Sequence, residues 1–280
     1  MNRFVLLVGL WAAAPLTAQQ PPTFEVETHA DLSYNPAKDA DPVRHKLDLY
    51  VPKGAKNFPV MMFVHGGSWK SGNKEMYAGL GRTFAKQGVG TAIINYRLTK
   101  PDNTVKHPDH IHDVAKAFLW VRDNAAKYGG DKDRLYVSGH SAGGHLVALL
   151  ATDESYLKAE GCDVKNIHGV MALSGVYTVQ PVIPLIQQVF SKDADVCMAA
   201  SPVAHISGKL PPFLLAYGDK DFPTMDKMAE DFGMKLKAAK GNVDVMKIDQ
   251  RNHFTIIINV AANAADPLTK AMVAFVQGKK

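Results

Sequence analysis

The sequence is poor in cysteine and has no long run of one kind of side chain. Only two of its 280 residues are cysteine, which excludes a disulfide framework, and no Cys-x-x-Cys pair indicates a zinc site. Its 32 Lys and Arg against 27 Asp and Glu give a net charge of +5 without a basic run that could follow a phosphate backbone. We therefore expect no metal ion and no nucleic-acid partner. With 46% hydrophobic residues, the composition is that of a globular protein.

The longest apolar run at the N-terminus is too short to cross a membrane. It covers residues 4–16, whereas a spanning helix needs about 20 residues. Arg3 precedes this run and Ala18, a small residue, precedes a polar one, which is the layout of a secretory signal peptide. We predict that residues 1–18 are a signal peptide cleaved after Ala18, with Ala14 as the alternative, and that the protein is secreted or periplasmic. A buried first helix is the competing interpretation.

From about residue 24 onward, β-branched runs alternate with helical patterns. The middle runs are continuously apolar, as in parallel strands that are buried on both faces. This alternation predicts one α/β domain over residues 19–280, with an open, mostly parallel sheet and helices on both faces. The expected strands are 23–28, 45–51, 60–65, 91–96, 135–138, 169–173, 213–217 and 243–248. The expected helices are 74–87, 111–128, 141–152, 224–240 and 266–277, the last capped by Asp266 with Pro267 at its first position.

Residues 176–212 break the alternation. Pro181, Pro184 and Pro202 interrupt a short helical pattern at 182–190. Because insertions at the carboxyl edge of a parallel sheet usually shape the ligand site, we predict a cap-like insertion that determines substrate preference.

The two cysteines lie near this insertion. Cys197 is within it, and Cys162 comes just before the strand that leads to it. In an oxidising compartment they could form a disulfide that tethers the insertion, but two separate buried thiols are equally compatible with the sequence.

A Gly-x-Ser-x-Gly motif lies between a predicted strand and a predicted helix. Gly139 and Gly143 flank Ser141 at distances of two residues, so a sharp, strained turn can form there with the serine hydroxyl above the sheet. The amide of Ala142 then lies at a helix N-terminus, facing whatever the hydroxyl attacks. We predict that Ser141 is a nucleophile; the alternative is an ordinary turn with a serine N-cap.

A second glycine-containing loop follows the strand at 60–65. Gly66 and Gly67 let the backbone approach a ligand, and loop amides can then donate to a developing negative charge. We predict an oxyanion hole made of the amides of Gly66, Gly67, Ser68 and Ala142. His65, which opens the loop, is expected to brace it through backbone hydrogen bonds.

A serine nucleophile needs a base and a carboxylate that orients the base. At a strand-to-helix turn of this kind the carboxylate and then the histidine follow the serine in the chain. Of the histidines after Ser141, only His253 lies in a loop after a strand and follows a suitable carboxylate. Asp221 is the predicted acid. Asp219 is its competitor, with turn formation as its expected role.

Three aromatic residues are candidates for the substrate pocket. Trp69 and Phe222 lie next to predicted catalytic loops, and Tyr177 lies within the insertion. We expect them to line the acyl or alcohol pocket, although aromatic side chains of this kind can equally belong to the core.

Together these motifs resemble the α/β-hydrolase superfamily over nearly the whole chain. The segments at 65–69 and 139–143 resemble its carboxylesterase and kynurenine-formamidase-like branch, whose oxyanion motif is His-Gly-Gly-x-Trp. The segments at 174–177 and 252–254 are also similar to that branch. Ser68 departs from hormone-sensitive-lipase-like esterases, which have a third glycine there.

The resemblance implies an eight-stranded α/β-hydrolase fold and a serine esterase that uses no cofactor. It implies hydrolysis of small acyl esters, including acetyl or feruloyl esters of plant polysaccharides, through a Ser-His-Asp triad and an acyl-enzyme intermediate. An aryl formamidase is the first alternative, and a catalytically silent binding module of the same fold is the second. The sequence leaves the oligomeric state open.

Overall fold

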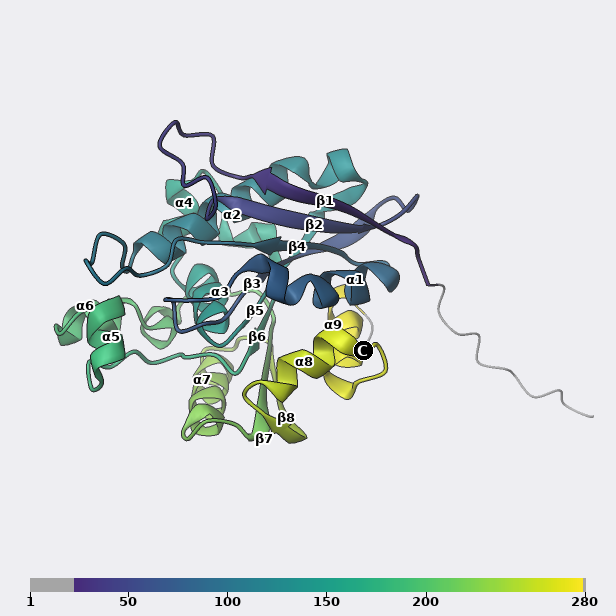
Figure 1. The fold of residues 1–280 in the computed structure, drawn as a ribbon. Coiled ribbons are helices and arrows are strands. Elements are labelled where there is room, and N and C mark those ends of the chain that lie inside the picture. Colours follow the sequence, from purple (N-terminus) through teal and green to yellow (C-terminus); the bar gives the residue numbers. More distant parts are fainter. Residues whose placement is uncertain (1–22, 279–280) are drawn as a thin grey trace, which may run out of the picture.

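The computed structural model describes residues 23–278. Its centre is an eight-stranded sheet with the order β1-β2-β4-β3-β5-β6-β7-β8 (Figure 1). Only β2 runs against its neighbours β1 and β4, and the remaining pairs are parallel. The predicted mostly parallel sheet is thus confirmed. The strands are β1 (Val26–Ser33), β2 (Lys46–Pro52), β3 (Phe58–Val64), β4 (Gly90–Ile94), β5 (Gly130–His140), β6 (Ile167–Leu173), β7 (Phe213–Lys220) and β8 (Val243–Asn252).

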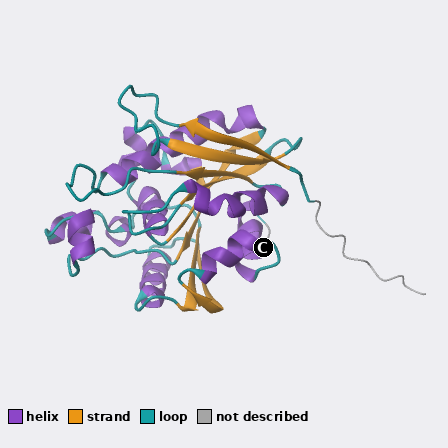
Figure 2. Ribbon diagram, in the orientation of Figure 1, coloured by secondary structure: helices purple, strands orange, loops and turns teal. Residues whose placement is uncertain are grey.

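Helices cover both faces of the sheet (Figure 2). One face packs against α2, α3 and α7, and the other packs against α1, α8 and α9. The α-helices are α1 (Ala78–Lys86), α2 (Asp109–Asn124), α3 (Ala142–Thr152), α4 (Ser155–Ala159), α5 (Pro184–Val189), α6 (Ala194–Ala199), α7 (Met225–Ala238), α8 (Thr255–Ala262) and α9 (Pro267–Gln277). Short 3₁₀ helices are η1 (Lys74–Tyr77), η2 (Ala125–Tyr128), η3 (Val164–Asn166) and η4 (Pro202–His205).

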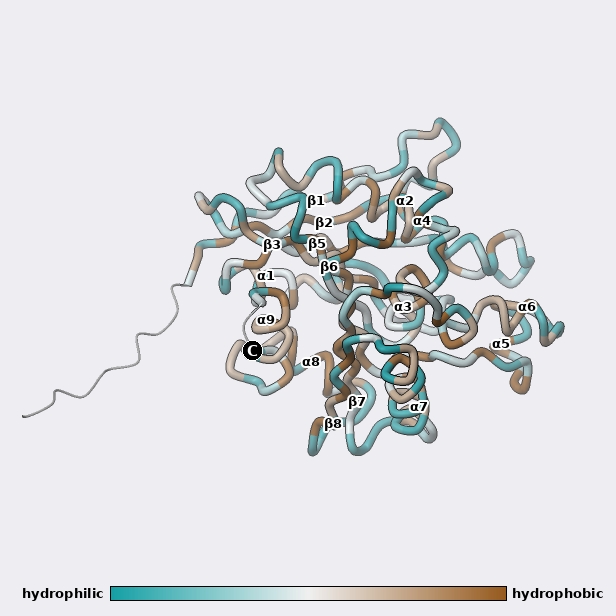
Figure 3. Tube along the Cα trace, turned by 180° about the vertical axis from the view of Figure 1, so that it is seen from behind, coloured by the Kyte–Doolittle hydropathy of each residue, from teal (hydrophilic) through white to brown (hydrophobic). Residues whose placement is uncertain are grey.

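The hydrophobic core follows the middle strands. Every residue of β3 is buried, as expected for a continuous apolar strand with helices on both sides. The hydropathy colouring of Figure 3 shows the same arrangement, with hydrophobic colour along the central strands and hydrophilic colour on the outer loops. At the last helix the expected cap is present, because Asp266 accepts hydrogen bonds from the amides of Leu268 and Thr269 at 3.0 and 3.3 Å.

The structure differs from the sequence prediction at several helices. Helices α4 and α6 were not expected, and the helix expected over 111–128 is divided into α2 and η2. The helix expected over 74–87 is divided into η1 and α1, since Asn73 caps η1 and Tyr77 has a non-helical backbone. Helix α8 was not predicted at all. It directly follows the loop of His253, and its consecutive isoleucines favour a strand by intrinsic propensity, so its helical form depends on tertiary packing.

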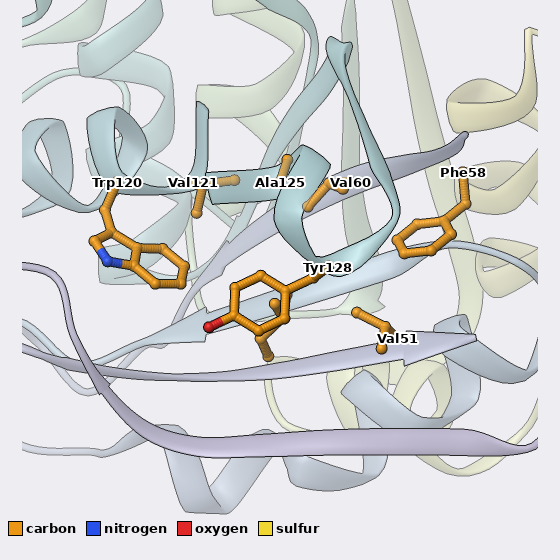
Figure 4. A pocket seen from close by; sticks show the side chains of 8 residues that line it. Val51, Phe58, Val60, Trp120, Val121, Ala125 and Tyr128 are labelled. Carbon is orange, nitrogen blue, oxygen red and sulfur yellow. The ribbon is translucent and has the colours of Figure 1, made fainter. Parts of the chain in front are cut away.

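A small cavity lies between β3 and α2, at the amino end of the strand (Figure 4). It has a volume of about 10 Å³ and only hydrophobic and aromatic residues line it. A cavity of this size holds at most about one water molecule, and apolar cavities usually stay empty. We therefore regard it as a packing gap in the core.

The two cysteines are free, buried thiols, so the structure favours the second of the two arrangements left open by the sequence. The predicted signal peptide lies outside the described residues. Between residues 23 and 278, no helix is long and apolar enough to cross a membrane.

Candidate active site

Ser141 occupies a strained turn between β5 and α3. Its φ of 56° lies in the left-handed region, which is costly for a residue with a side chain. Both flanking glycines are required for space: a Cβ at Gly139 would lie 2.3 Å from the Gly143 carbonyl oxygen, and one at Gly143 would lie 2.0 Å from that of Val64. The turn therefore packs directly against the end of β3, where the oxyanion loop begins.

A chain of hydrogen bonds joins Ser141, His253 and Asp221. His253 Nδ1 lies 2.7 Å from Asp221 Oδ1, and His253 Nε2 lies 2.9 Å from Ser141 Oγ. A carboxylate can only accept, so Nδ1 carries the proton and Nε2 is left to accept from the serine hydroxyl. The structure thus brings together the three residues predicted as nucleophile, base and acid, from loops after β5, β8 and β7.

Further donors hold the Asp221 carboxylate. The Ser174 hydroxyl donates to Oδ2 at 2.5 Å, and the Phe222 amide donates to Oδ1 at 2.7 Å. Burial raises the pKa of Asp221, but hydrogen bonds from His253, Ser174 and the Phe222 amide outweigh burial and hold the pKa below its ordinary value. Asp221 is therefore a carboxylate at neutral pH. The role of Ser174 was missed in the sequence, although its position after β6 places it at the same sheet edge.

Asp219 has a different position. Its carboxylate accepts a hydrogen bond at 3.0 Å from the amide of Arg251, which lies on the neighbouring strand β8. It was expected to stabilise its own turn; instead it links the ends of β7 and β8. Its contact lies two residues before His253, on the same segment.

His140 contacts His253, the predicted base. Its Nε2–H donates to the His253 backbone carbonyl at 2.8 Å, and the two rings are 4.8 Å apart. Burial lowers the pKa of His140 to about 3, so its ring is neutral at neutral pH and one ring nitrogen is an acceptor. The hydrogen bond fixes the backbone that carries the base.

The oxyanion loop offers two free amides. Gly66 N–H is occupied, because it donates to the Tyr77 hydroxyl at 3.2 Å. The amides of Gly67 and Ser68 have no acceptor within residues 23–278. The predicted contribution of Gly66 is therefore wrong in this arrangement, and Gly67 and Ser68 remain as loop donors beside the Ala142 amide at the start of α3. His65 braces the loop as predicted, through Nδ1 and the Gly66 carbonyl at 2.7 Å.

A cavity of about 690 Å³ opens beside Ser141. One wall comes from the oxyanion loop, η1 and the start of α1, and the opposite wall comes from α8. Its lining includes Gly66, Gly67, Ser68, Met76, Tyr77, Gly79, His140, Ser141, Phe222, His253, Phe254, Ile257, Ile258, Ala261 and Ala262. We call it the α1–α8 pocket.

Of the three aromatic residues predicted to line the pocket, only Phe222 does. Its ring stacks on His253 at a centroid distance of 4.2 Å. Trp69 is buried, and its indole N–H donates to His145 Nδ1 at 3.2 Å. Tyr177 is fully buried and stacks on Phe232 at 4.5 Å. Both are core residues, which is the alternative that the sequence left open.

The insertion at 176–212 does not line this pocket. It packs instead on the far side of the oxyanion loop, where Phe190 contacts Trp69 with ring centroids 5.0 Å apart. The expectation that the insertion shapes the site is therefore not supported by the placement of its residues, and α8 forms the wall that we had assigned to it.

A mostly parallel eight-stranded sheet, with a serine after β5, a carboxylate after β7 and a histidine after β8, defines the α/β-hydrolase class. Within this class the chain belongs to the BD-FAE family, whose model matches residues 47–236. It is 32% identical to esterase LipC of Mycobacterium tuberculosis, over 74% of this chain and 56% of that protein.

Another relative and two solved structures are similar to the chain. The chain is 27% identical to a probable isoprenylcysteine alpha-carbonyl methylesterase of Oryza sativa subsp. japonica, over 78% of this chain and 57% of that protein. It therefore spans little more than half the length of these curated relatives. A truncated carbohydrate esterase from gut microbiota has a TM-score of 0.75 at 21% identity, covering 92% of this chain and 99% of that one. A Pyrobaculum calidifontis esterase has a TM-score of 0.72 at 22% identity, covering 92% and 87%.

Proposed function

We propose that the protein is a serine hydrolase that cleaves small carboxylic esters through an acyl-enzyme intermediate. The hydrogen-bonded chain from Ser141 through His253 to Asp221, at the mouth of an open pocket, carries this proposal. The esterase names of several relatives support it.

The reaction follows from the positions of the donors and acceptors. His253 takes the proton of the Ser141 hydroxyl as the oxygen attacks the ester carbonyl, and Asp221 stabilises the imidazolium that forms. The amides of Gly67, Ser68 and Ala142 donate hydrogen bonds to the negatively charged oxygen of the tetrahedral intermediate. His253 then gives its proton to the leaving alcohol, and water, activated by the same base, releases the acid.

Replacement of the nucleophile tests the proposal. Ser141→Ala should lower kcat for p-nitrophenyl acetate by about 10⁴-fold or more, because no other group can form the acyl-enzyme. Ser138→Ala is a matched control, since Ser138 is a buried serine of β5, three residues before Ser141, whose hydroxyl has no partner among the described residues. Wild-type activity in Ser141→Ala would refute the assignment, and a phosphonate ester that labels Ser141 would support it independently by peptide mass.

The alcohol part of the substrate is a finer proposal. We infer that acetyl or feruloyl esters of plant polysaccharides are substrates, because the pocket beside Ser141 is open and a carbohydrate esterase from gut microbiota has the same fold. Acetylated xylan and methyl ferulate should then be hydrolysed beside p-nitrophenyl acetate. Faster turnover of N-formylkynurenine than of every ester would favour the formamidase alternative instead.

Secretion is a further proposal, supported by the charge, apolar run and small residues of positions 1–18. Expression in a bacterial host should yield a periplasmic or secreted protein whose intact mass is that of a chain starting at Gln19. Recovery of the full-length chain, with Met1 retained, from the cytoplasm alone would contradict it.

A further inference from the structure

The α1–α8 pocket has a polar end and an apolar arm. The hydroxyl, imidazole and free amide groups gather near Ser141. Beyond them, Met76 and Gly79 lie on one wall, and Ile257, Ile258 and Ala261 lie on the other. Figure 1 shows the two helices that form the walls, α1 and α8, side by side. The arm thus begins at the reacting atoms and runs between two helices.

No Asp, Glu, Lys or Arg side chain is among the residues that line this pocket. A charged group on the substrate would therefore enter the arm without an ionic partner, which costs free energy that an uncharged chain does not lose. The arm is suited to hydrocarbon, and it is poorly suited to a carboxylate, a phosphate or an ammonium group.

Large apolar side chains are exposed to water around the arm. Met76 is 70% exposed, Phe222 48%, Phe254 59% and Ile258 58%, and all four line the pocket. Scattered exposed hydrophobic residues need no explanation, but four around one concave surface next to a nucleophile indicate that a ligand covers them.

The arm has a definite length. Helix α8 carries its wall from Phe254, next to the base, to Ala262; eight residue steps span about 12 Å along a helix. At the far end the two helices meet: Thr83 Oγ1 donates to the Ala261 carbonyl at 2.7 Å. There a Cβ added at Gly79 would lie 3.4 Å from that same carbonyl oxygen. The absence of a side chain at Gly79 keeps this end open.

We propose that the α1–α8 pocket binds an extended, uncharged hydrocarbon chain of the ester, of about eight to ten carbons, and that Gly79 and Ala262 set its maximum length. The chain belongs to the acyl or to the alcohol part of the ester, with the carbonyl at Ser141 in both cases. This inference rests on the proposed ester hydrolysis and adds the class of substrate to it.

Two substrate series distinguish the two parts of the ester. The first is p-nitrophenyl esters from acetyl to myristoyl, and the second is acetate esters of linear alcohols from ethanol to tetradecanol. In one series kcat/KM should rise by about four-fold for each added methylene that is buried. It should stop rising near eight to ten carbons, and the series that shows this rise identifies the part that lies in the arm.

Two substitutions shorten the arm from opposite walls. Gly79→Leu and Ala262→Leu should each move the maximum by two or more carbons toward shorter chains. The ratio of kcat/KM for the ten-carbon ester to that for the two-carbon ester should then fall by about ten-fold or more. Lys86→Leu adds the same side chain at an exposed position of α1 outside the pocket. It should change neither the chain length at which kcat/KM is highest nor the ratio between the ten-carbon and two-carbon esters. Ala262 is exposed, so we expect Ala262→Leu to retain the fold even if Gly79→Leu strains the contact between the helices.

The outcomes separate the inference from the function on which it rests. If Ser141-dependent hydrolysis of the acetyl ester is present but kcat/KM is flat or falls with chain length in both series, the inference is wrong and the esterase function stands. An unchanged maximum in both leucine variants would also overturn it. If no ester is hydrolysed in a Ser141-dependent manner, both proposals fail together.

Discussion

At the scale of single residues, the geometry of the site depends on side chains that never touch the substrate. Ser174 and the Phe222 amide supply hydrogen bonds that keep Asp221 charged, and His140 holds the backbone of His253. Such contacts fix the base within the narrow range of positions that general-base catalysis needs. The three reacting residues alone therefore do not define the site.

Loss of the Ser174 hydroxyl should weaken catalysis selectively. Ser174→Ala removes a hydrogen bond to a charged group, and we expect kcat to fall by about ten-fold. Ser201→Ala provides the comparison, because Ser201 is a buried serine whose hydroxyl binds backbone groups of the insertion. Both variants should lose about 1–2 kcal/mol of unfolding free energy in urea, but only the first should lose activity. Equal kcat values in the two variants would contradict this role.

Trp69 is predicted from the sequence to line the pocket, but in the structure it is a core residue. Because it packs in the core and donates to His145, Trp69→Phe should cost about 2 kcal/mol and lower Tm by about 4–8 °C. The ratio of kcat/KM for butyrate and acetate esters should not change. Phe222→Ala should change this ratio and have little effect on stability, since the Phe222 ring is 48% exposed and lines the pocket. A changed ester ratio in the tryptophan variant would return Trp69 to the pocket.

At the scale of the elements, the backbone of the oxyanion loop tightly limits which residues it can contain. Gly67 has a φ of 121°, and a Cβ there would lie 2.2 Å from the Ser71 carbonyl oxygen. This close approach is made within one tight turn, in which the Ser71 amide also donates to the Gly67 carbonyl at 3.0 Å. Any side chain at Gly67 must therefore displace the free amides of the loop.

Gly67→Ala should reduce kcat by about 10²-fold or more, because one misplaced oxyanion donor is sufficient for a loss of that size. Gly54→Ala is the matched control: Gly54 also has a left-handed φ, of 76°, but nothing lies within 4 Å of its added Cβ. It should cost about 1 kcal/mol of stability and leave activity unchanged. Circular dichroism of both variants would show that the fold is retained, and full activity of the folded Gly67 variant would exclude the loop as a donor.

The sequence predicts most of the strands and the reacting residues because their signals are local. Buried parallel strands are continuous apolar runs, and the strained turn at Ser141 requires glycines at fixed distances. Helix α8 and the contact of Gly66 with Tyr77 lack such signals. Consecutive isoleucines favour a strand until packing against α1 makes them helical, and no pattern reveals that the Tyr77 hydroxyl occupies the Gly66 amide.

At the scale of the whole molecule, the site exists only when the complete sheet has formed. Its groups come from the ends of β3, β5, β6, β7 and β8, so residues separated by more than 100 positions meet at one edge. Activity therefore reports the folded fraction of the whole sheet, and changes in global stability will appear as changes in active enzyme.

Buried histidines link this global stability to pH. Burial is the first cause that lowers the pKa of five of them, which therefore stay neutral in the folded protein well below their ordinary pKa of 6.5. These are His65, His107 and His110, with pKa values of about 4, and His140 and His145, with values of about 3. In the unfolded chain each would take up a proton near pH 6.5. Their contribution is therefore fully present above pH 6.5 and is lost as the pH falls toward 4 and 3.

Stability should consequently fall steeply in mild acid. Each such histidine lets the unfolded chain bind up to one more proton than the folded protein, so the free energy of unfolding falls as the pH drops below 6.5. Urea unfolding at pH 7.5, 6.5, 5.5 and 5.0 should show the midpoint dropping at each step below 6.5. His110→Gln keeps a side chain able to bond the Thr99 hydroxyl. In this variant the slope of unfolding free energy against pH should decrease by an amount that corresponds to about one bound proton. A midpoint that is constant from pH 7.5 to 5.0 would mean that these rings accept protons without leaving the folded state.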